Sequence, residues 1–165
     1  VSEQLDDRDR PELHRLVGTA RDSATEALAE LRDLSRGLRP PALDAGLADA
    51  LSTLAARSVL PVEVTADLPG RPSPAIENLA YFCAAELLAN AAKHAGARSC
   101  RIELASGDGT LRVRVSDDGR GGARVVPDGG LAGLAQRVRP VDGELRVVSP
   151  DGGPTAVTVV LPLRA

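Results

Sequence analysis

The sequence of 165 residues contains no methionine and no tryptophan, and its only aromatic residues are Tyr81 and Phe82. Its hydrophobic core must therefore be built from alanine, leucine and valine. The chain holds two cysteines, Cys83 and Cys100, which are too few for a disulfide framework. We therefore expect a reducing compartment, the cytoplasm.

Long apolar runs and a surplus of one charge are also missing. No segment approaches the ~18–20 apolar residues that a membrane span requires, and no basic-then-apolar signal peptide opens the chain. Basic and acidic residues are interleaved, which leaves no cationic stripe for a nucleic-acid backbone. We expect no nucleic-acid partner, and membrane contact only through upstream segments. Because the chain begins at Val1, we expect it to be part of a longer protein.

Residues 11–38 have the periodicity of a long helix with one narrow apolar stripe. Apolar side chains alternate steps of four and three from Leu13 to Leu38, a heptad pattern typical of a coiled coil or bundle. The helix ends before Pro40, because proline disfavours helical geometry at the residue before it. No second heptad segment follows, so the stripe predicts a partner helix in another chain or upstream. A helix folded back on its own domain is the alternative.

The remaining sequence predicts helices first and mostly strands later. The patterns predict helices over residues 43–56, 75–95 and 131–138, and strands over 61–66, 100–105, 111–116, 144–148 and 156–163. Residues 106–110 carry a hairpin signal, and Gly96 is placed to end the second helix. This order favours an α+β fold with helices on one face of a mixed sheet.

Four polar residues lie along one side of the helix predicted over 75–95. Glu86, Asn90, Lys93 and His94 follow one another at i, i+4, i+7 and i+8. An amide oxygen is a hard ligand suited to Mg²⁺, and lysine and histidine are natural partners of phosphate. The same spacing also describes a solvated helix face with ordinary charge pairs, so the pattern alone leaves both interpretations open.

Three glycine-rich segments follow this helix. Residues 117–122 end a predicted strand, and a buried Asp117 there can accept a hydrogen bond from an exocyclic amine, which favours adenine over guanine. Residues 129–133 lead into a helix N-terminus, where unpaired N–H groups favour phosphate. Residues 152–155 enter a strand. Each segment is also compatible with an ordinary turn, and none is a P-loop or a dinucleotide fingerprint.

In this order the segments resemble the ATP-binding domain of sensor histidine kinases, of the GHKL ATPase superfamily. Residues 86–95 look like the N box of that family, and its three glycine boxes look like residues 117–121, 130–137 and 153–155. Residues 34–47 look like the junction in the branch that contains the nitrate and nitrite sensors. The resemblance implies a two-layer α/β sandwich of the histidine-kinase ATPase type at 42–165. It also implies a partial dimerisation and phosphoacceptor domain at 1–41, with the second helix of the bundle.

The resemblance implies Mg-ATP as the ligand and distributes roles among the residues. Asn90 would coordinate the Mg²⁺, Glu86 would orient or polarise the groups reacting near the γ-phosphate, and Asp117 would bind the adenine amine. The other implied nucleotide contacts are Lys93, His94, Gly119, Gly121, Gly130, Leu131, Gly133 and Thr155.

By the same resemblance, the intact protein would be a homodimer that transfers the γ-phosphoryl group to a histidine and then to a response regulator receiver domain. Pro154 and Gln136 depart from the family pattern, and no phosphoacceptor motif is visible, since Arg15 follows His14 where the family has an acid. We interpret His14 as a solvated residue and expect the acceptor outside this chain. An anti-sigma-factor-type serine kinase on the same fold, or a degenerate scaffold without ATP, are the alternatives.

Overall fold

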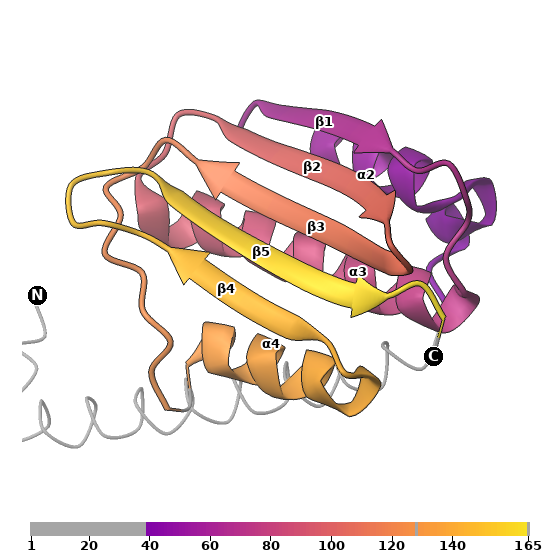
Figure 1. Ribbon diagram of the computed structural model, residues 1–165. Helices are drawn as coiled ribbons and strands as arrows, with labels where there is room; N and C mark the ends of the chain where they lie inside the picture. The colour runs from indigo at the N-terminus through magenta and orange to yellow at the C-terminus, as the bar shows by residue number, and fades with distance from the viewer. Residues whose placement is uncertain (1–38, 128, 165) are drawn as a thin grey trace, which may run out of the picture. The chain divides into compact units, whose positions relative to one another are not determined.

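Five strands form one mixed sheet in the computed structural model, which describes residues 39–127 and 129–164 (Figure 1). The strand order is β1-β2-β3-β5-β4; β1 and β2 are parallel and the other neighbours antiparallel. The strands are β1 (Val62–Asp67), β2 (Cys100–Gly107), β3 (Thr110–Asp117), β4 (Glu144–Val148) and β5 (Thr155–Pro162). The predicted α+β class with a mixed sheet is confirmed. The predicted bundle helix at 11–38 and His14 lie outside the described residues.

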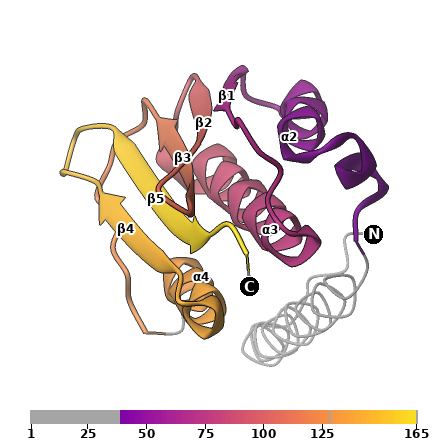
Figure 2. The same ribbon diagram turned by 45° about the vertical axis from the view of Figure 1, so that its right-hand side comes forward.

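The helices cover one face of this sheet (Figure 2), as the sequence predicts. They are α2 (Leu47–Ala56), α3 (Pro74–Asn90) and α4 (Gly130–Val138), with short 3-10 turns η1 (Pro41–Ala45) and η3 (Arg139–Val141) and a π-helical turn η2 (Ala91–Ala95). None of the described helices is long and apolar enough to cross a membrane.

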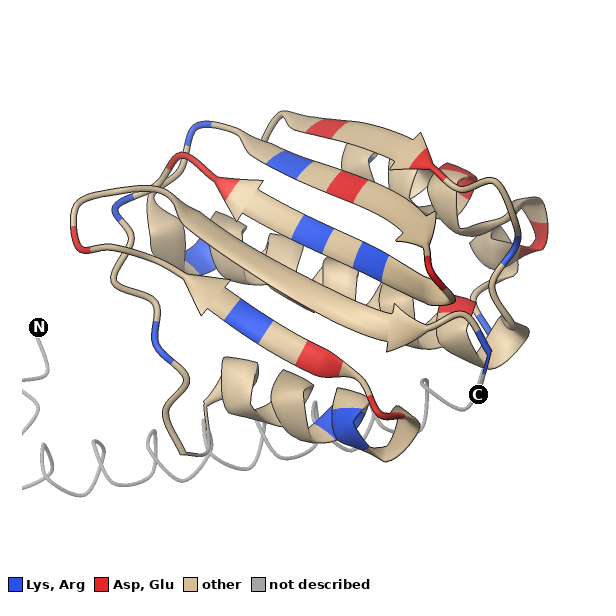
Figure 3. Ribbon diagram, viewed as in Figure 1, with Lys and Arg blue, Asp and Glu red and all other residues tan. Residues whose placement is uncertain are grey.

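Alternation along the strands separates the core from the open face of the sheet. Ile102 of β2, Val113 of β3 and Val159 of β5 are fully buried beneath the helices, because successive side chains of a strand point to opposite faces. The intervening charged residues lie on the open face (Figure 3), where Arg101 of β2 forms a 2.8 Å ion pair with Glu63 of β1. This is the pattern of a sheet with one solvated face.

Two predicted elements differ in detail from the structure. The helix predicted over 43–56 is interrupted, because Gly46 has a φ of 106° and ψ of 168°, far from helical geometry, and α2 starts only after it. The predicted hairpin is present but tighter, because β2 and β3 extend to Gly107 and Thr110. Asp108 and Gly109 make its two-residue turn with φ of 52° and 75°.

Helix α3 packs against the sheet through small and aliphatic residues, including Ala80, Cys83 and Ala84. Both cysteines of the chain are buried, and neither forms a disulfide. The charged residue Glu77, in the first turn of α3, is also buried, with 1% of its surface exposed. Arg71 donates to its two carboxylate oxygens at 2.8 and 3.1 Å and to the Leu43 carbonyl at 2.7 Å. One guanidinium therefore ties η1 and the loop before α3 to the helix.

Candidate functional site

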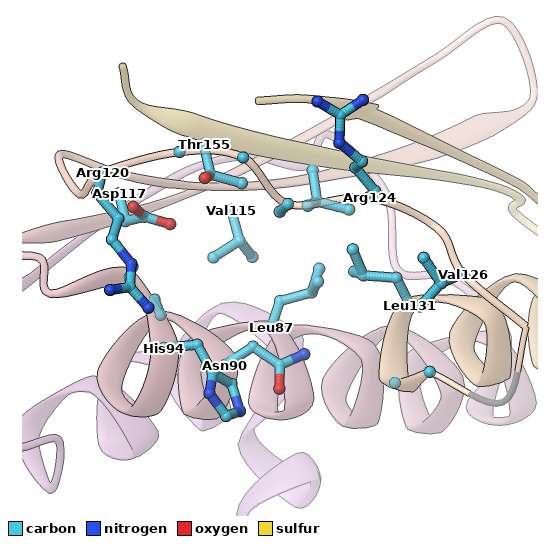
Figure 4. Close-up of a pocket in the computed structure, with 18 residues that line it drawn as sticks. Leu87, Asn90, His94, Val115, Asp117, Arg120, Arg124, Val126, Leu131 and Thr155 are labelled. Carbon is cyan, nitrogen blue, oxygen red and sulfur yellow. The ribbon is translucent and has the colours of Figure 1, made fainter. Parts of the chain in front are cut away.

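A cavity of about 340 Å³ lies between α3 and the sheet (Figure 4). Helix α3 and the turn η2 contribute Leu87, Asn90 and His94 to one wall, and the sheet contributes Val115 and Thr155 to the opposite wall. The loop between β3 and α4 and the first turn of α4 close the remaining side. The volume falls within the range of about 300–1,000 Å³ that is usual for small-molecule sites.

The structure brings most of the predicted site residues to this cavity. Its wall includes Asn90, His94, Asp117, Gly121, Gly130, Leu131 and Thr155. The other predicted residues are not part of the wall: Glu86, Lys93, Gly119 and Gly133. Lys93 is exposed on η2 and Glu86 is half-buried on α3, so a contact from either residue to a ligand stays a prediction.

The turn η2 positions the end of α3 against the loop that follows β3. Its π-helical form is a local rearrangement that is frequent at functional sites. The Ala95 carbonyl accepts a hydrogen bond from the Arg120 N–H at 2.9 Å. A Cβ at Gly119 would lie only 2.5 Å from that carbonyl oxygen, so this close approach requires glycine. The first predicted glycine therefore shapes the wall without lining the cavity.

Asp117 and Thr155 are direct partners across β3 and β5, and both are 9% exposed. Both side chains lie on the cavity side of the sheet (Figure 4). Oδ1 of Asp117 accepts the N–H of Gly119 at 2.9 Å, and within the described residues Oδ2 receives no hydrogen bond. The unpaired oxygen of a largely buried carboxylate at a cavity wall is a suitable acceptor for a ligand amine.

The neighbouring carboxylate, Asp118, has a structural task instead. It accepts hydrogen bonds from the N–H groups of Arg98 and Ser99 at 2.7 and 3.0 Å and from the Ser99 hydroxyl at 3.2 Å. The backbone hydrogen bonds from Ser99 and Arg98 lower the pKa of Asp118. The two adjacent aspartates therefore divide their roles, one holding the start of β2 and the other facing the cavity.

Residues 120–123 of the β3–α4 loop are held against residues 149–153 of the β4–β5 turn, and we call this contact the clasp. The Gly152 N–H donates to the Arg120 carbonyl at 2.8 Å, and the Ala123 N–H donates to Oγ of Ser149 at 2.9 Å. Gly121 has a φ of 64°, and a Cβ there would overlap the carbonyl oxygen of Pro150. The clasp therefore depends on glycine at this position.

The sequence did not predict two residues that the tertiary structure brings to the site, Arg120 and Ser149. Arg120 lines the cavity, and its place between two glycines of the first glycine box was the one available signal. Ser149 is separated from every predicted motif, and no local pattern points to its contact with Thr155, whose Oγ1 lies 2.8 Å from its own Oγ. Arg120 and Ser149 reach the site because the β3–α4 loop packs against the β4–β5 turn.

The first turn of α4 lies against the polar side of α3. A Cβ at Gly130 would be 3.7 Å from Nδ2 of Asn90 and 3.9 Å from Oε1 of Glu86, which is ordinary contact. Among the residues that the structure describes, no side chain caps the N-terminus of α4, and the N–H groups of a helix's first turn can bind an anion. Mg²⁺ binds through one or two protein oxygens plus phosphate oxygens and waters. The amide of Asn90 and the carboxylate of Glu86 fit that requirement.

The two departures from the family pattern lie away from the cavity. Pro154 is exposed, precedes β5 and lines a separate groove on the sheet, and Gln136 is exposed on α4. Neither side chain contributes to the wall, so neither supplies a reason for a degenerate site.

Known proteins share this fold and site region. Residues 75–165 match the family of histidine kinase-, DNA gyrase B- and HSP90-like ATPases. The chain is 28% identical over 140 residues to the sensor histidine kinase YvfT of Bacillus subtilis, which covers 84% of this chain and 38% of YvfT. It is 34% identical over 152 residues to the sensor histidine kinase MctS of Rhizobium johnstonii, which covers 84% of this chain and 32% of MctS.

Among solved structures, the blue-light activated histidine kinase of Erythrobacter litoralis has a TM-score of 0.60 and 27% identity, over 71% of this chain and 42% of that one. The chain therefore belongs to the family of histidine kinase-, DNA gyrase B- and HSP90-like ATPases. It spans well under half the length of the curated relatives named above.

Proposed function

We propose that this chain is the ATP-binding catalytic part of a sensor histidine kinase. It binds Mg-ATP in the cavity between α3 and the sheet, and the γ-phosphoryl group goes to a histidine outside this chain. The observation that carries the proposal is the presence of Asn90 and Asp117 on the walls of one cavity. The amide oxygen of Asn90 suits a hard metal ion, and the carboxylate of Asp117 suits a nucleobase amine.

The base would occupy the end of the cavity at Asp117. Its carboxylate accepts the exocyclic amine of adenine, whereas the carbonyl of guanine at the same place would face a second acceptor. Val115 and Leu87 supply apolar surface for the ring. Gly119 and Gly121 keep the backbone close enough to form this wall.

The phosphates would lie toward the start of α4. N–H groups of that turn, with Gly130 and Gly133, favour negative charge. Asn90 holds the metal ion, Glu86 orients the reacting groups, and His94 and Lys93 face phosphate or ribose. Bound Mg-ATP supplies the phosphoryl group, and the protein supplies positioning and charge stabilisation, which are the main requirements of phosphoryl transfer.

In the intact protein, the phosphoryl group would pass from the histidine to an aspartate of a response regulator receiver domain. The sensor histidine kinases that this chain resembles support this proposal. Residues 11–38 would form the second helix of a bundle that joins two copies, since their heptad stripe needs a partner.

Calorimetric titration with ATP and ADP, with and without Mg²⁺, tests the proposal. Wild-type protein should bind adenine nucleotides saturably and more tightly with Mg²⁺. Asp117→Asn should weaken binding by about tenfold or more, because a hydrogen bond to a charged group contributes about 1.5–3 kcal/mol. Asp142→Asn is the matched control, since Asp142 is exposed, lies outside the cavity and has a φ of 56° that asparagine tolerates.

Two results would contradict the proposal. One is the absence of wild-type binding at millimolar nucleotide. The other is an unchanged affinity of Asp117→Asn, which would remove the assignment of the base to this end of the cavity.

A further inference from the structure

The hydroxyl of Ser149 sits where the clasp meets the cavity wall. Its Oγ accepts the Ala123 N–H at 2.9 Å and lies 2.8 Å from Oγ1 of Thr155. Ser149 is outside the cavity wall, whereas Ala123 and Thr155 are part of it. Ser149 is therefore the side chain through which the loop after β3 and the start of β5 are held together behind the wall.

Either hydroxyl can donate in the contact between Ser149 and Thr155, and the two arrangements present different groups to the cavity. A serine hydroxyl has one proton and two lone pairs, and one lone pair of Ser149 already accepts from Ala123. If Thr155 donates, its proton is used inside the protein and only its oxygen is left for a ligand. If Ser149 donates, it both accepts from Ala123 and donates to Thr155, and the proton of Thr155 is left for a ligand in the cavity.

We propose that Ser149 is a positioning residue of the nucleotide site, which turns the Thr155 hydroxyl into a donor facing the cavity and fixes the backbone of Ala123 in the wall. This inference rests on the proposed function. Thr155 is the cross-strand partner of Asp117, so the wall presents a carboxylate acceptor beside a hydroxyl donor. Adenine complements this pair, because its exocyclic amine donates and the neighbouring ring nitrogen accepts. Hypoxanthine does not, because its carbonyl accepts and its neighbouring ring N–H donates.

The clasp should survive the loss of Ser149. The Gly152 N–H still donates to the Arg120 carbonyl, and Gly121 still packs on the carbonyl of Pro150. Ser149→Ala should therefore fold, while the hydroxyl of Thr155 becomes free to rotate and the Ala123 N–H loses its partner. We expect a loss of ADP affinity of about five- to tenfold, the effect of one hydrogen bond of roughly 1 kcal/mol or slightly more.

The test is calorimetric titration of the full 165-residue chain with Mg-ADP and with Mg-IDP, its hypoxanthine counterpart. Ser149→Ala should lose ADP affinity and preference for ADP over IDP. Ser149→Thr keeps the hydroxyl and should restore both. Ser116→Ala is the matched control, because Ser116 is a half-buried serine of β3 outside the cavity wall.

A double-mutant cycle with Thr155→Val separates positioning from general damage. If Ser149 acts through Thr155, Ser149→Ala should cost clearly less affinity in the Thr155→Val background than in the wild type. Equal losses in both backgrounds would overturn the inference, as would an unchanged ADP affinity of Ser149→Ala in a wild type that binds. Failure of the wild type to bind either nucleotide would overturn the proposed function and this inference together, so the two failures are distinguishable.

Discussion

Gly121 offers a direct test of the clasp between residues 120–123 and 149–153. Its φ of 64° lies in the left-handed region, and an added Cβ would overlap the carbonyl oxygen of Pro150 and lie 2.5 Å from that of Gly153. Both neighbours are backbone atoms, which cannot rotate away as the end of a side chain can. Gly121→Ala must therefore either strain this contact or open it.

The two responses have similar costs. Keeping the backbone in place costs about 1–2 kcal/mol for alanine in a left-handed conformation and about 1–3 kcal/mol for overpacking. Opening the clasp loses the hydrogen bonds of Gly152 to Arg120 and of Ala123 to Ser149, at about 1 kcal/mol each, together with the packing around them. We therefore expect Gly121→Ala to lower the free energy of unfolding by about 2–4 kcal/mol.

Urea unfolding of three glycine variants measures this effect. Gly122 also has a positive φ, 79°, but its nearest neighbour is Oδ1 of the exposed Asp151 at 3.1 Å, so Gly122→Ala should cost only about 1–2 kcal/mol. Gly133 lies within α4 with nothing within 4 Å of an added Cβ, so Gly133→Ala should stabilise by up to about 1 kcal/mol. A loss for Gly121→Ala no larger than that for Gly122→Ala would refute the clasp.

Three further predictions concern buried and hydrogen-bonded groups. Backbone hydrogen bonds from Ser99 and Arg98 lower the pKa of Asp118 below its ordinary 3.8. The ionised carboxylate therefore stabilises the fold above pH 3.8, and this stability is lost as the pH falls through the lowered pKa. In urea melts on acidification, Asp118→Asn should lose less stability than the wild type. Burial raises the pKa of the Cys100 thiol from 9.0 to about 11, so the unfolding free energy should fall as the pH rises across that interval, and a thiol reagent at about pH 8 should modify Cys100 only in unfolded protein. Arg71→Ala should lower the urea midpoint more than Glu77→Gln does, because it removes the guanidinium from a buried carboxylate. In Glu77→Gln the charge that remains is that of Arg71, which is half-exposed and can be solvated. Equal midpoints for the two variants would contradict this reasoning.

Local features of the sequence determined the elements of this fold. The strand-like runs at 100–105 and 111–116, with the hairpin signal between them, predicted the antiparallel pair that β2 and β3 form. The turn between them follows from Asp108 and Gly109, which tolerate positive φ. Gly96 was predicted to end the helix, and it follows η2 in a left-handed conformation with a φ of 62°. Each of these features depends on residues close together in the chain.

The order of the motifs likewise pointed to seven of the residues that line the cavity, yet their individual contacts depend on tertiary structure. No local pattern indicates that β5 enters the sheet between β3 and β4, and this insertion alone makes Thr155 the partner of Asp117. Nor does any local pattern indicate the role of Asp118, which depends on the contact of its carboxylate with the backbone N–H groups of Arg98 and Ser99.

Ser149 is the clearest case of a role that only the tertiary structure decides. In the sequence it is a serine at the end of a strand, without a motif. In the structure its hydroxyl joins the Ala123 N–H and the Thr155 hydroxyl, which belong to segments on either side of it in the chain. Periodicity and turn chemistry report the conformation of each segment, whereas hydrogen bonds between segments depend on which strand ends the packed core brings together.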